Sequence, residues 1–397
     1  MKMIDWWGTK AVALFLIINA LLSSPAIAGE RRPFDLSKVP MDDGWEDTGI
    51  NAYTIEPCGK DSVYMGLEYL EGEPGKAPVK LRVRNLITGV EKTSSAEPRQ
   101  TQEFLGCTPD SRYLLIQKSP PVVHPPHKVD IYDTATMQVV ASFSNGKGSD
   151  HFLRLMSPDG RYLITGDKKS VITLPDGRAI TTLPLLDRLR GVFSTAWSAD
   201  GRKVYVLHDT NPQLLLIHDV ETDRQRFIQL VYDYPDQFGV EVMAHPKTGR
   251  VYIRAGILFD HEIEFRDSLL MFDPATLPAG AEKVEVRPKI LGDTFATMTF
   301  GPDDTFFFSL MPDPEAETPS FPEEYSGIFI ADTHGKVLKR VTKERYDNGP
   351  TFMPEVGYLI ISRKNTLPGI IALTMRTILK QRNPTRSSVP AQAKKKN

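Results

Sequence analysis

The chain has 397 residues, and its 48 basic and 50 acidic side chains give a formal net charge of −2, so it lacks the global positive field that favours nucleic-acid binding. Its 31 prolines and 28 glycines are typical of a turn-rich β protein and exclude a largely helical one. Its two cysteines form no CxxC or CxxCH motif, which excludes thioredoxin-like redox chemistry and c-type haem attachment.

The first 28 residues predict a cleavable signal peptide. Two lysines precede an apolar run of 12 residues at 11–22, which is short for a membrane span. The tripeptide Ala-Ile-Ala at 26–28 matches a signal-peptidase site, so we expect cleavage after Ala28 and a lead-in over 29–43. The alternative is an uncleaved N-terminal anchor. The favoured interpretation is a periplasmic or secreted protein whose mature chain has no transmembrane segment.

One motif then recurs seven times: an apolar stretch enters a tight turn of the Ser-Pro-Asp-Gly kind, and a strand follows. The intervals between copies are 49, 49, 41, 47, 56 and 52 residues, and the copies begin at Cys58, Cys107, Met156, Trp197, Ala244, Phe300 and Phe352. A period near 50 with short strands is typical of propeller blades. We therefore predict an all-β, seven-bladed β-propeller with four-stranded blades over 44–380, followed by a disordered basic tail over 381–397.

Each repeat divides into four β segments, most clearly from 151 onward, where strands are expected at 151–157, 161–165, 170–174 and 179–183. Third strands of the other blades are expected at 79–84, 128–132, 214–218, 268–272, 327–331 and 369–373. The last repeat lacks a clear turn before its expected outer strand at 374–380. Segment 44–54 is an alternative source of a closing strand, because pairing between chain ends removes exposed sheet edges.

The two cysteines, Cys58 and Cys107, head consecutive repeats. Export favours a disulfide between them. Equivalent positions on neighbouring blades point in the same rotational sense, however, and a bridge requires Cα atoms within about 7 Å. A disulfide and two buried free thiols both remain open.

The sequences SPDGRYLI at 157–164 and SADGRKVYV at 198–206 resemble the bacterial YVTN-type and TolB-type β-propeller repeats, which are WD40-like. This resemblance implies the propeller architecture. Such propellers include lactonase-like hydrolases, heavy subunits of amine dehydrogenases, and binding or assembly proteins without catalysis. No residue-level match to the catalytic sets of the first two carries over to this sequence.

Topology predicts where a site would lie. In a four-stranded blade, the connections from second to third strand and from outer strand to the next inner strand share one face. The longest predicted loops fall on that face, at 118–127, 208–213, 257–267 and 312–326, and such loops are where function concentrates. The alternating segment 260–266 predicts a small extra hairpin arm that is available to a partner.

The inner strands are expected to begin near the channel mouth, and polar residues at these positions would suit a small polar ligand: Asn51, Glu103, His151, Arg190, Glu241, Asp293 and Asn348. A second interpretation is catalytic, with His151 as general base, Asp150 or Glu241 orienting it and Arg190 stabilising an oxyanion. A third is a divalent metal site for zinc or copper, formed by His124, His127, His208 and His261. No other cofactor is expected.

The long loops without a catalytic motif favour an exported module that binds or assembles with an envelope protein, or that binds a small polar ligand, rather than an enzyme. The alternatives are a lactonase-like hydrolase and a subunit of a periplasmic dehydrogenase whose cofactor lies on another chain.

Overall fold

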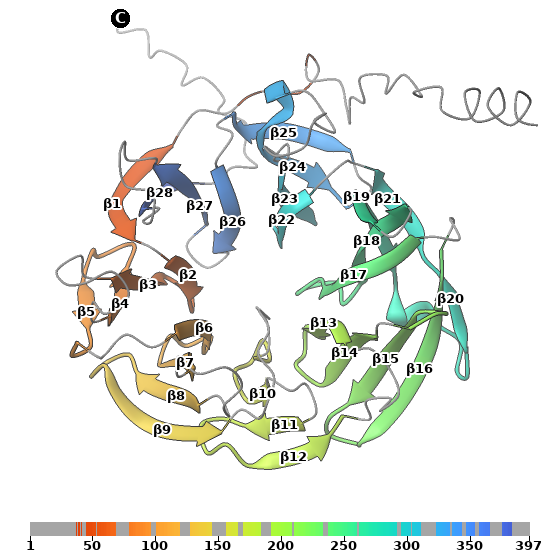
Figure 1. The fold of residues 1–397 in the computed structure, drawn as a ribbon, viewed down its shortest axis with the longest axis horizontal. Coiled ribbons are helices and arrows are strands. Elements are labelled where there is room, and N and C mark those ends of the chain that lie inside the picture. The colour runs from red at the N-terminus through yellow and green to blue at the C-terminus, as the bar shows by residue number, and fades with distance from the viewer. Residues whose placement is uncertain are drawn as a thin grey trace, which may run out of the picture.

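In the computed structural model, seven β-sheets follow one another around a ring, each with its first strand nearest the centre (Figure 1). We number them 1 to 7 in chain order of that inner strand. The structure describes residues 37, 39, 41, 45–52, 54–68, 79–96, 101–119, 128–144, 156–165, 170–183, 192–208, 210–232, 237–259, 262–291, 295–302, 304–310, 323–333, 336–343, 347–353, 357–365 and 375–382.

Sheet 1 consists of β2 (Thr54–Cys58), β3 (Ser62–Glu68), β4 (Val79–Asn85) and β5 (Glu91–Thr93). Sheet 2 consists of β6 (Thr101–Cys107), β7 (Tyr113–Ser119), β8 (Lys128–Asp133) and β9 (Gln138–Ser144). Sheet 3 consists of β10 (Tyr162–Ile164), β11 (Ser170–Thr173) and β12 (Ala179–Thr182). Sheet 4 consists of β13 (Val192–Trp197), β14 (Lys203–His208), β15 (Leu214–Asp219), β16 (Arg224–Val231) and β20 (Lys283–Glu285). Sheet 5 consists of β17 (Gln237–Ala244), β18 (Val251–Phe259), β19 (Glu262–Phe272) and β21 (Arg287–Leu291). Sheet 6 consists of β22 (Phe295–Phe300), β23 (Thr305–Leu310), β24 (Gly327–Asp332) and β25 (Val337–Thr342). Sheet 7 consists of β26 (Asp347–Met353), β27 (Tyr358–Asn365), β28 (Met375–Arg382) and β1 (Glu46–Ala52). Two short 3-10 turns, η2 (Pro274–Thr276) and η3 (Glu323–Tyr325), interrupt the strands.

The all-β propeller prediction is confirmed, although not every sheet has the predicted four strands. Six sheets have four or five strands, and sheet 3 has three in the part of the chain that the structure describes. The inner strand expected at 151–157 enters the described residues only at its end, where Met156 forms an isolated antiparallel bridge with Leu163.

Apolar packing between neighbouring sheets holds the ring together. The middle strands are apolar on both faces because a sheet covers each side, and all six residues of β23 are buried. Buried clusters join sheets 1 and 2, sheets 2, 3 and 4, sheets 4 and 5, sheets 5 and 6, and sheets 6 and 7. A further cluster around Ile50, Val63, Met65 and Met353 joins sheet 7 back to sheet 1.

The N-terminal strand closes the ring, as the alternative reading of segment 44–54 predicts. Strand β1 pairs antiparallel with β28, so the two ends of the chain complete sheet 7. The segment expected as the outer strand, 374–380, is instead the third strand, and 369–373 lies outside the described residues. Just before β1, the Trp45 indole Nε1 donates to the carbonyl of Val341 at 2.7 Å, and Met41 forms a parallel bridge with Arg340. The segment leading into β1 therefore contacts sheet 6 as well.

Strand β20 is an unpredicted link between sheets 4 and 5. The chain leaves β19, pairs through β20 in parallel with β16, and then returns as β21 to the edge of sheet 5. The Arg226 guanidinium of β16 donates to the carbonyls of Pro278 at 2.8 Å and Ala281 at 2.7 Å. Val286, which follows β20, is fully buried in the cluster between the two sheets.

We expect Arg226→Ala to lower the free energy of unfolding by about 1–2 kcal/mol, because it removes charge-assisted hydrogen bonds to two carbonyls. Chemical denaturation measures the change. Arg224→Ala on the same strand is the matched control, since Arg224 is exposed, and it should change stability by less than about 0.5 kcal/mol. Equal effects of the two substitutions would contradict a role for Arg226 in this link.

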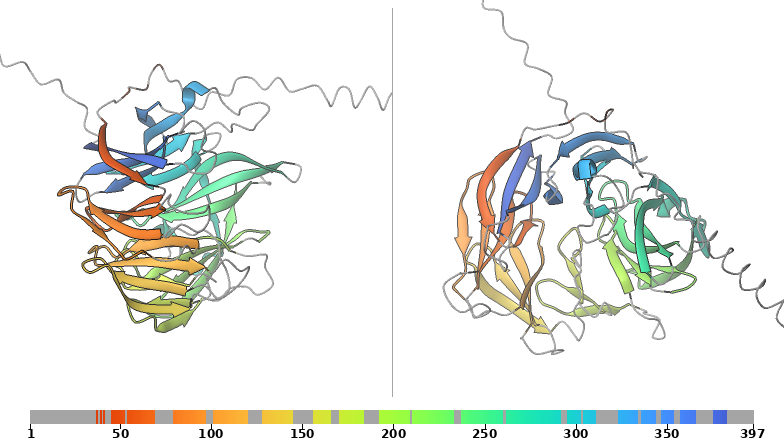
Figure 2. Two further views of the ribbon diagram at one scale, coloured as in Figure 1. Left: turned by 60° about the vertical axis from the view of Figure 1, so that its left-hand side comes forward. Right: turned by 45° about the horizontal axis from the view of Figure 1, so that its top comes forward.

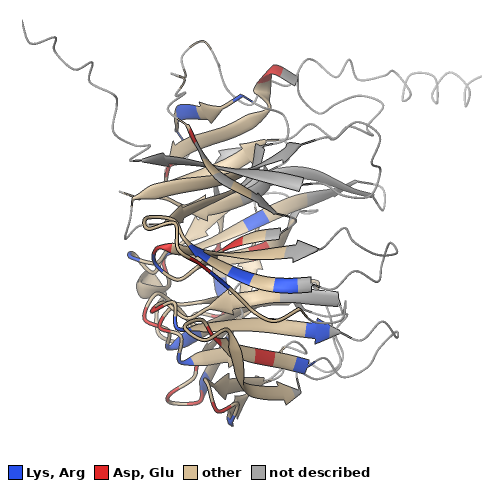
Figure 3. Ribbon diagram, turned by 90° about the vertical axis from the view of Figure 1, so that its left-hand side faces the viewer, with Lys and Arg blue, Asp and Glu red and all other residues tan. Residues whose placement is uncertain are grey.

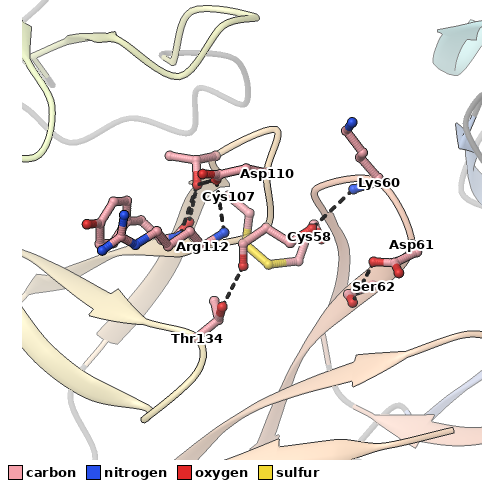
Figure 4. The surroundings of a disulfide bond; sticks show 11 residues. Cys58, Lys60, Asp61, Ser62, Cys107, Asp110, Arg112 and Thr134 are labelled. Atoms are coloured by element: carbon pink, nitrogen blue, oxygen red, sulfur yellow. Dashed lines mark hydrogen bonds between the residues drawn. A yellow bond between two sulfur atoms is a disulfide. The ribbon is translucent and has the colours of Figure 1, made fainter. Parts of the chain in front are cut away.

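A disulfide joins Cys58 and Cys107 across sheets 1 and 2, with the Cα atoms 4.7 Å apart (Figure 4). The geometric argument for free thiols is therefore wrong. Neighbouring sheets approach closely at this end: the Ser111 hydroxyl donates to the carbonyl of Cys58 at 3.1 Å and accepts from the Lys60 amide at 3.2 Å. Both cysteines are buried, so the bond lies inside the packing between the two sheets.

The predicted hairpin arm of sheet 5 is present in the backbone. Strands β18 and β19 continue to pair as far as Phe259 and Glu262, beyond a bulge near Ala255, and the hairpin extends outward from the ring (Figure 2). Within the described residues, no helix has the length and apolar character needed to cross a membrane.

Candidate functional site

The strand order gives the ring two different faces. The connections from first to second and from third to fourth strand lie on one face, which we call the turn face. The opposite connections, including 120–127 and 209–213, define the loop face. In the edge-on view of Figure 3, short turns bearing charged residues follow one another along the turn face.

The turns of the repeat are held by a capping aspartate. In sheet 3, the Ser157 hydroxyl donates to Asp159 Oδ1 at 2.6 Å, and the Arg161 amide donates to the same oxygen at 3.0 Å. Burial raises the pKa of Asp159, but these hydrogen bonds and the Arg161 guanidinium outweigh it, so the pKa lies below its usual value. The Asp of the sequence motif therefore has a structural role.

Successive turns also contact one another around the ring. Gly160 has a φ of +71°, and a Cβ on it would lie 2.7 Å from Pro109 of the neighbouring turn. A Cβ on Gly201 would likewise lie 2.9 Å from the Asp159 carboxylate. Glycine suits these two positions because it has no Cβ and adopts the left-handed region readily. These turns of sheets 2, 3 and 4 are thus occupied by contacts with each other, which favours the loop face as the functional surface.

A buried charge network supports the base of the loop 120–127. Lys118 is the penultimate residue of β7, and its ammonium group lies 2.8 Å from Asp130 Oδ2 and donates to the Tyr132 hydroxyl at 2.6 Å. Lys128 Nζ and the Ser142 hydroxyl contact the other carboxylate oxygen at 2.8 and 2.6 Å. Burial alone would raise the pKa of Asp130. The hydrogen bonds from these partners outweigh it and bring the pKa below its usual value, so the carboxylate stays ionised.

An amide network plays the same part in sheet 4. Gln213 is buried and its Nε2 donates to the carbonyls of His208 at 3.2 Å and Gly239 at 2.8 Å. Its Oε1 accepts from the Gly239 amide at 2.7 Å and from the Tyr232 hydroxyl. One side chain therefore joins the loop after β14 to the start of β17 in sheet 5.

His208 lies at the edge of this network. It is only 1% exposed, its ring lies 5.9 Å from that of Phe227, and its Nε2 has no hydrogen-bond partner. Burial lowers the pKa of His208. Burial also lowers the pKa of His218 and of His245, against the opposing carboxylates of Asp223 and Asp304. All three imidazoles are neutral at pH 7.

We expect the free energy of unfolding to fall as the pH drops from 7.5 to 5.5. A lowered folded pKa means that the unfolded chain takes up the proton first, so the stabilisation is complete above about pH 6.5 and is lost below it. The lowered pKa of Asp159 acts only at more acidic pH, so it does not contribute in this window. Thermal melts across the range measure the effect. A melting temperature that is flat, or that rises on acidification, would contradict it.

Four of the residues predicted to surround a channel mouth, Asn51, Glu103, Glu241 and Asn348, fall within the described residues. Asn51 lies on β1, the outermost strand of sheet 7, so its predicted place on an inner strand is wrong; β1 completes the last sheet instead of beginning the first. Glu103 and Asn348 lie on inner strands, opposite Gln117 and Ser362.

The proposed catalytic set is only partly visible. Glu241 lies on the inner strand β17 and forms an ion pair with Arg254 of β18, with Nε and Oε2 3.2 Å apart. It therefore already has a basic partner within its own sheet. Asp150, His151, Arg190 and Asp293 lie outside the described residues.

Of the four predicted metal ligands, only His208 can be placed, and it is buried against Phe227. His124, His127 and His261 lie outside the described residues. In the part of the chain that the structure covers, no group of three or more His, Cys, Asp or Glu side chains could hold a metal ion.

Sequence reasoning missed Lys118, Asp130 and Gln213. A basic residue at each end of one predicted loop, with an aspartate two residues further along, was a signal for the first network. Gln213 has no comparable signal, because one of its main partners, Gly239, comes from the neighbouring sheet.

No family model matches this chain, and no curated protein matches it in sequence. Solved structures do match it in fold. The β-propeller domain of Cps50 (Swd1) from Myceliophteria thermophila has a TM-score of 0.51 at 10% identity, covering 83% of this chain and 98% of that domain. The β-propeller domain of the trilobed protease from Pyrococcus furiosus, described as having an open velcro topology, has a TM-score of 0.52 at 12% identity, covering 86% of this chain and 98% of that domain. At such low identity the likeness shows that this chain has a β-propeller fold, and it shows the fold alone.

Proposed function

We propose that this chain is an exported β-propeller that serves as a binding or assembly module and recognises an envelope protein through its loop face. The observation that carries the proposal is the pair of buried networks at Lys118–Asp130 and Gln213–Gly239, which fix the bases of two loops on the same face. Binding surfaces on propellers and similar scaffolds use loops held by a rigid frame. A small polar ligand at the same face is the other outcome that the test below distinguishes.

Export is part of this proposal. The Cys58–Cys107 disulfide supports it, because disulfides form and persist in oxidising compartments. The predicted signal peptide at 1–28 points to the same compartment, periplasmic or secreted, and lies outside the described residues.

The seven-blade count and the YVTN/TolB-type assignment are also proposed. We infer that sheet 3 is a complete seventh blade whose inner strand leads into Met156, and the bridge from Met156 to Leu163 supports this. The capped turns at Asp110, Asp159 and Asp200 support the repeat type, since each accepts from a hydroxyl two residues earlier.

The proposal is tested by in-cell cross-linking of the tagged full-length protein, followed by recovery and rebinding with purified components. The double variant His124→Ala/His127→Ala alters the segment of the sequence that connects β7 and β8. The control Lys60→Ala/Arg178→Ala alters two exposed residues of the turn face. We expect the loop variant to lose the partner at least about tenfold, roughly the cost of one good contact residue, and the control to retain it. A partner that both variants retain, or that both lose while staying folded, would overturn the proposal. Binding of a small molecule without any protein partner would replace the envelope protein by a polar ligand.

A further inference from the structure

The turn at 245–249 departs from the rule that governs the other turns. In sheets 2, 3 and 4, the first residue of the turn between the first and second strands is a threonine or a serine. In sheet 5 that residue is His245. The amides of Lys247 and Thr248 both donate to His245 Nδ1, each at 3.2 Å. Since Nδ1 accepts, the neutral ring carries its proton on Nε2.

His245 also contacts the next sheet. Its side chain is 1% exposed, and its ring meets that of Phe300 on β22 edge-on at 4.8 Å. Its Nε2 lies 3.6 Å from Oδ1 of Asp304, in the turn that follows β22. Tyr252 of β18 packs on the same Phe300 ring at 5.4 Å. One imidazole therefore caps a turn of sheet 5 and faces a carboxylate of sheet 6.

We propose that His245 is an acid-sensitive clasp between sheets 5 and 6. A second proton can enter the ring only at Nδ1. There it converts the acceptor of two backbone hydrogen bonds into a donor, so the amides of Lys247 and Thr248 lose their partner and the turn opens. This inference is independent of the proposed binding function, because the clasp lies on the turn face.

The charged groups around the ring act in opposite directions. Burial lowers the pKa of His245, and Lys247 and Arg250 of its own turn lower it further, whereas Asp304 from sheet 6 raises it. The net direction is downward, so the closed turn holds a neutral ring at pH 7. Below about pH 6.5 the open turn, whose imidazole is solvated, takes up the proton first. Acid therefore favours the open form.

The chain contains a natural comparison for this turn. In the turn after β4, Asn85 Oδ1 accepts from the amides of Ile87 at 2.9 Å and Thr88 at 2.8 Å. This is the same double cap, made by an amide oxygen that does not titrate. His245→Asn should therefore preserve the cap and remove its pH dependence.

Hydrogen exchange of the full mature chain tests the clasp, with rates at pH 7.5 and 5.0 expressed as protection factors. We expect protection of the Lys247 and Thr248 amides to fall at least about tenfold at pH 5.0, since one proton taken up on opening gives up to tenfold per pH unit. Protection of Ile87 and Thr88 should stay constant in the same sample, which makes the result independent of any variant. His245→Asn should abolish the loss, and Asp304→Asn should deepen it, because the closed imidazolium then faces no carboxylate. Equal protection at both pH values in the natural sequence, or the same loss in His245→Asn, would overturn the proposal.

Discussion

Replacing Cys58 and Cys107 together by alanine is expected to lower the free energy of unfolding by about 4 kcal/mol, the chain-entropy value for a closed loop of roughly 50 residues. The two cysteines are separated by 49 residues and both are buried between sheets 1 and 2. Without the bond, the unfolded chain gains the freedom of that whole segment. Denaturation with and without a reductant measures the effect.

The reductant provides the control for this experiment. It should lower the stability of the natural protein to near that of the alanine variant, and it should leave the variant unchanged. A loss below about 1 kcal/mol in the variant would mean that packing between the two sheets, rather than the covalent bond, holds them together.

Removing the carboxylate at the centre of the loop-face network should have an effect of similar size. Asp130→Ala leaves the Lys118 ammonium buried without its main partner, and breaking such a pair costs about 3–5 kcal/mol. Asp130 and Lys118 are 2% and 7% exposed, so solvent can replace little of the lost interaction. Equilibrium unfolding of the purified protein measures the loss.

A double variant separates the unpaired charge from the lost packing. Lys118→Met/Asp130→Leu replaces the ion pair by apolar side chains of similar size, and such exchanges are often close to neutral. We therefore expect it to recover at least half of the stability lost in Asp130→Ala. If the double variant is as unstable as the single one, the cause is not an uncompensated charge.

Local patterns predict much of this fold. Turns capped by Asp and strands rich in apolar residues depend on near neighbours in the sequence, so the expected third strands at 79–84, 128–132, 214–218 and 327–331 are found within one or two residues. The closing role of segment 44–54 is one of two alternatives, since the last repeat lacks a clear turn before its expected outer strand and pairing between chain ends removes exposed sheet edges.

Long-range pairing explains what the sequence does not predict. Strand β20 is a three-residue segment, Lys283–Glu285, that pairs with β16 rather than with its neighbours in sequence. The place of Asn51 on an outer strand follows from the same closure, since that strand pairs with β28 and not with β2.

The sequence predicts the face on which a site is proposed, and it does not predict which residues support the loops of that face. The strand order of a four-stranded blade determines which connections share a side. Which side chains support those loops depends on packing across strands, as for Lys118 with Tyr132, or across sheets, as for Gln213 with Gly239. Histidine count alone did not predict that His208 would be buried against Phe227.

The central claim is that the two ends of the chain close the ring, and a cross-link between β1 and β28 tests it most directly. Asn51 and Thr377 are register partners, so cysteines at these two positions should form a disulfide that peptide mapping detects in the non-reduced protein. A control pair at Asn51 and Arg382, at the other end of β28, should stay unlinked. Closure predicts a link in the first pair only; no link in the first pair, or equal linking of both, would contradict it.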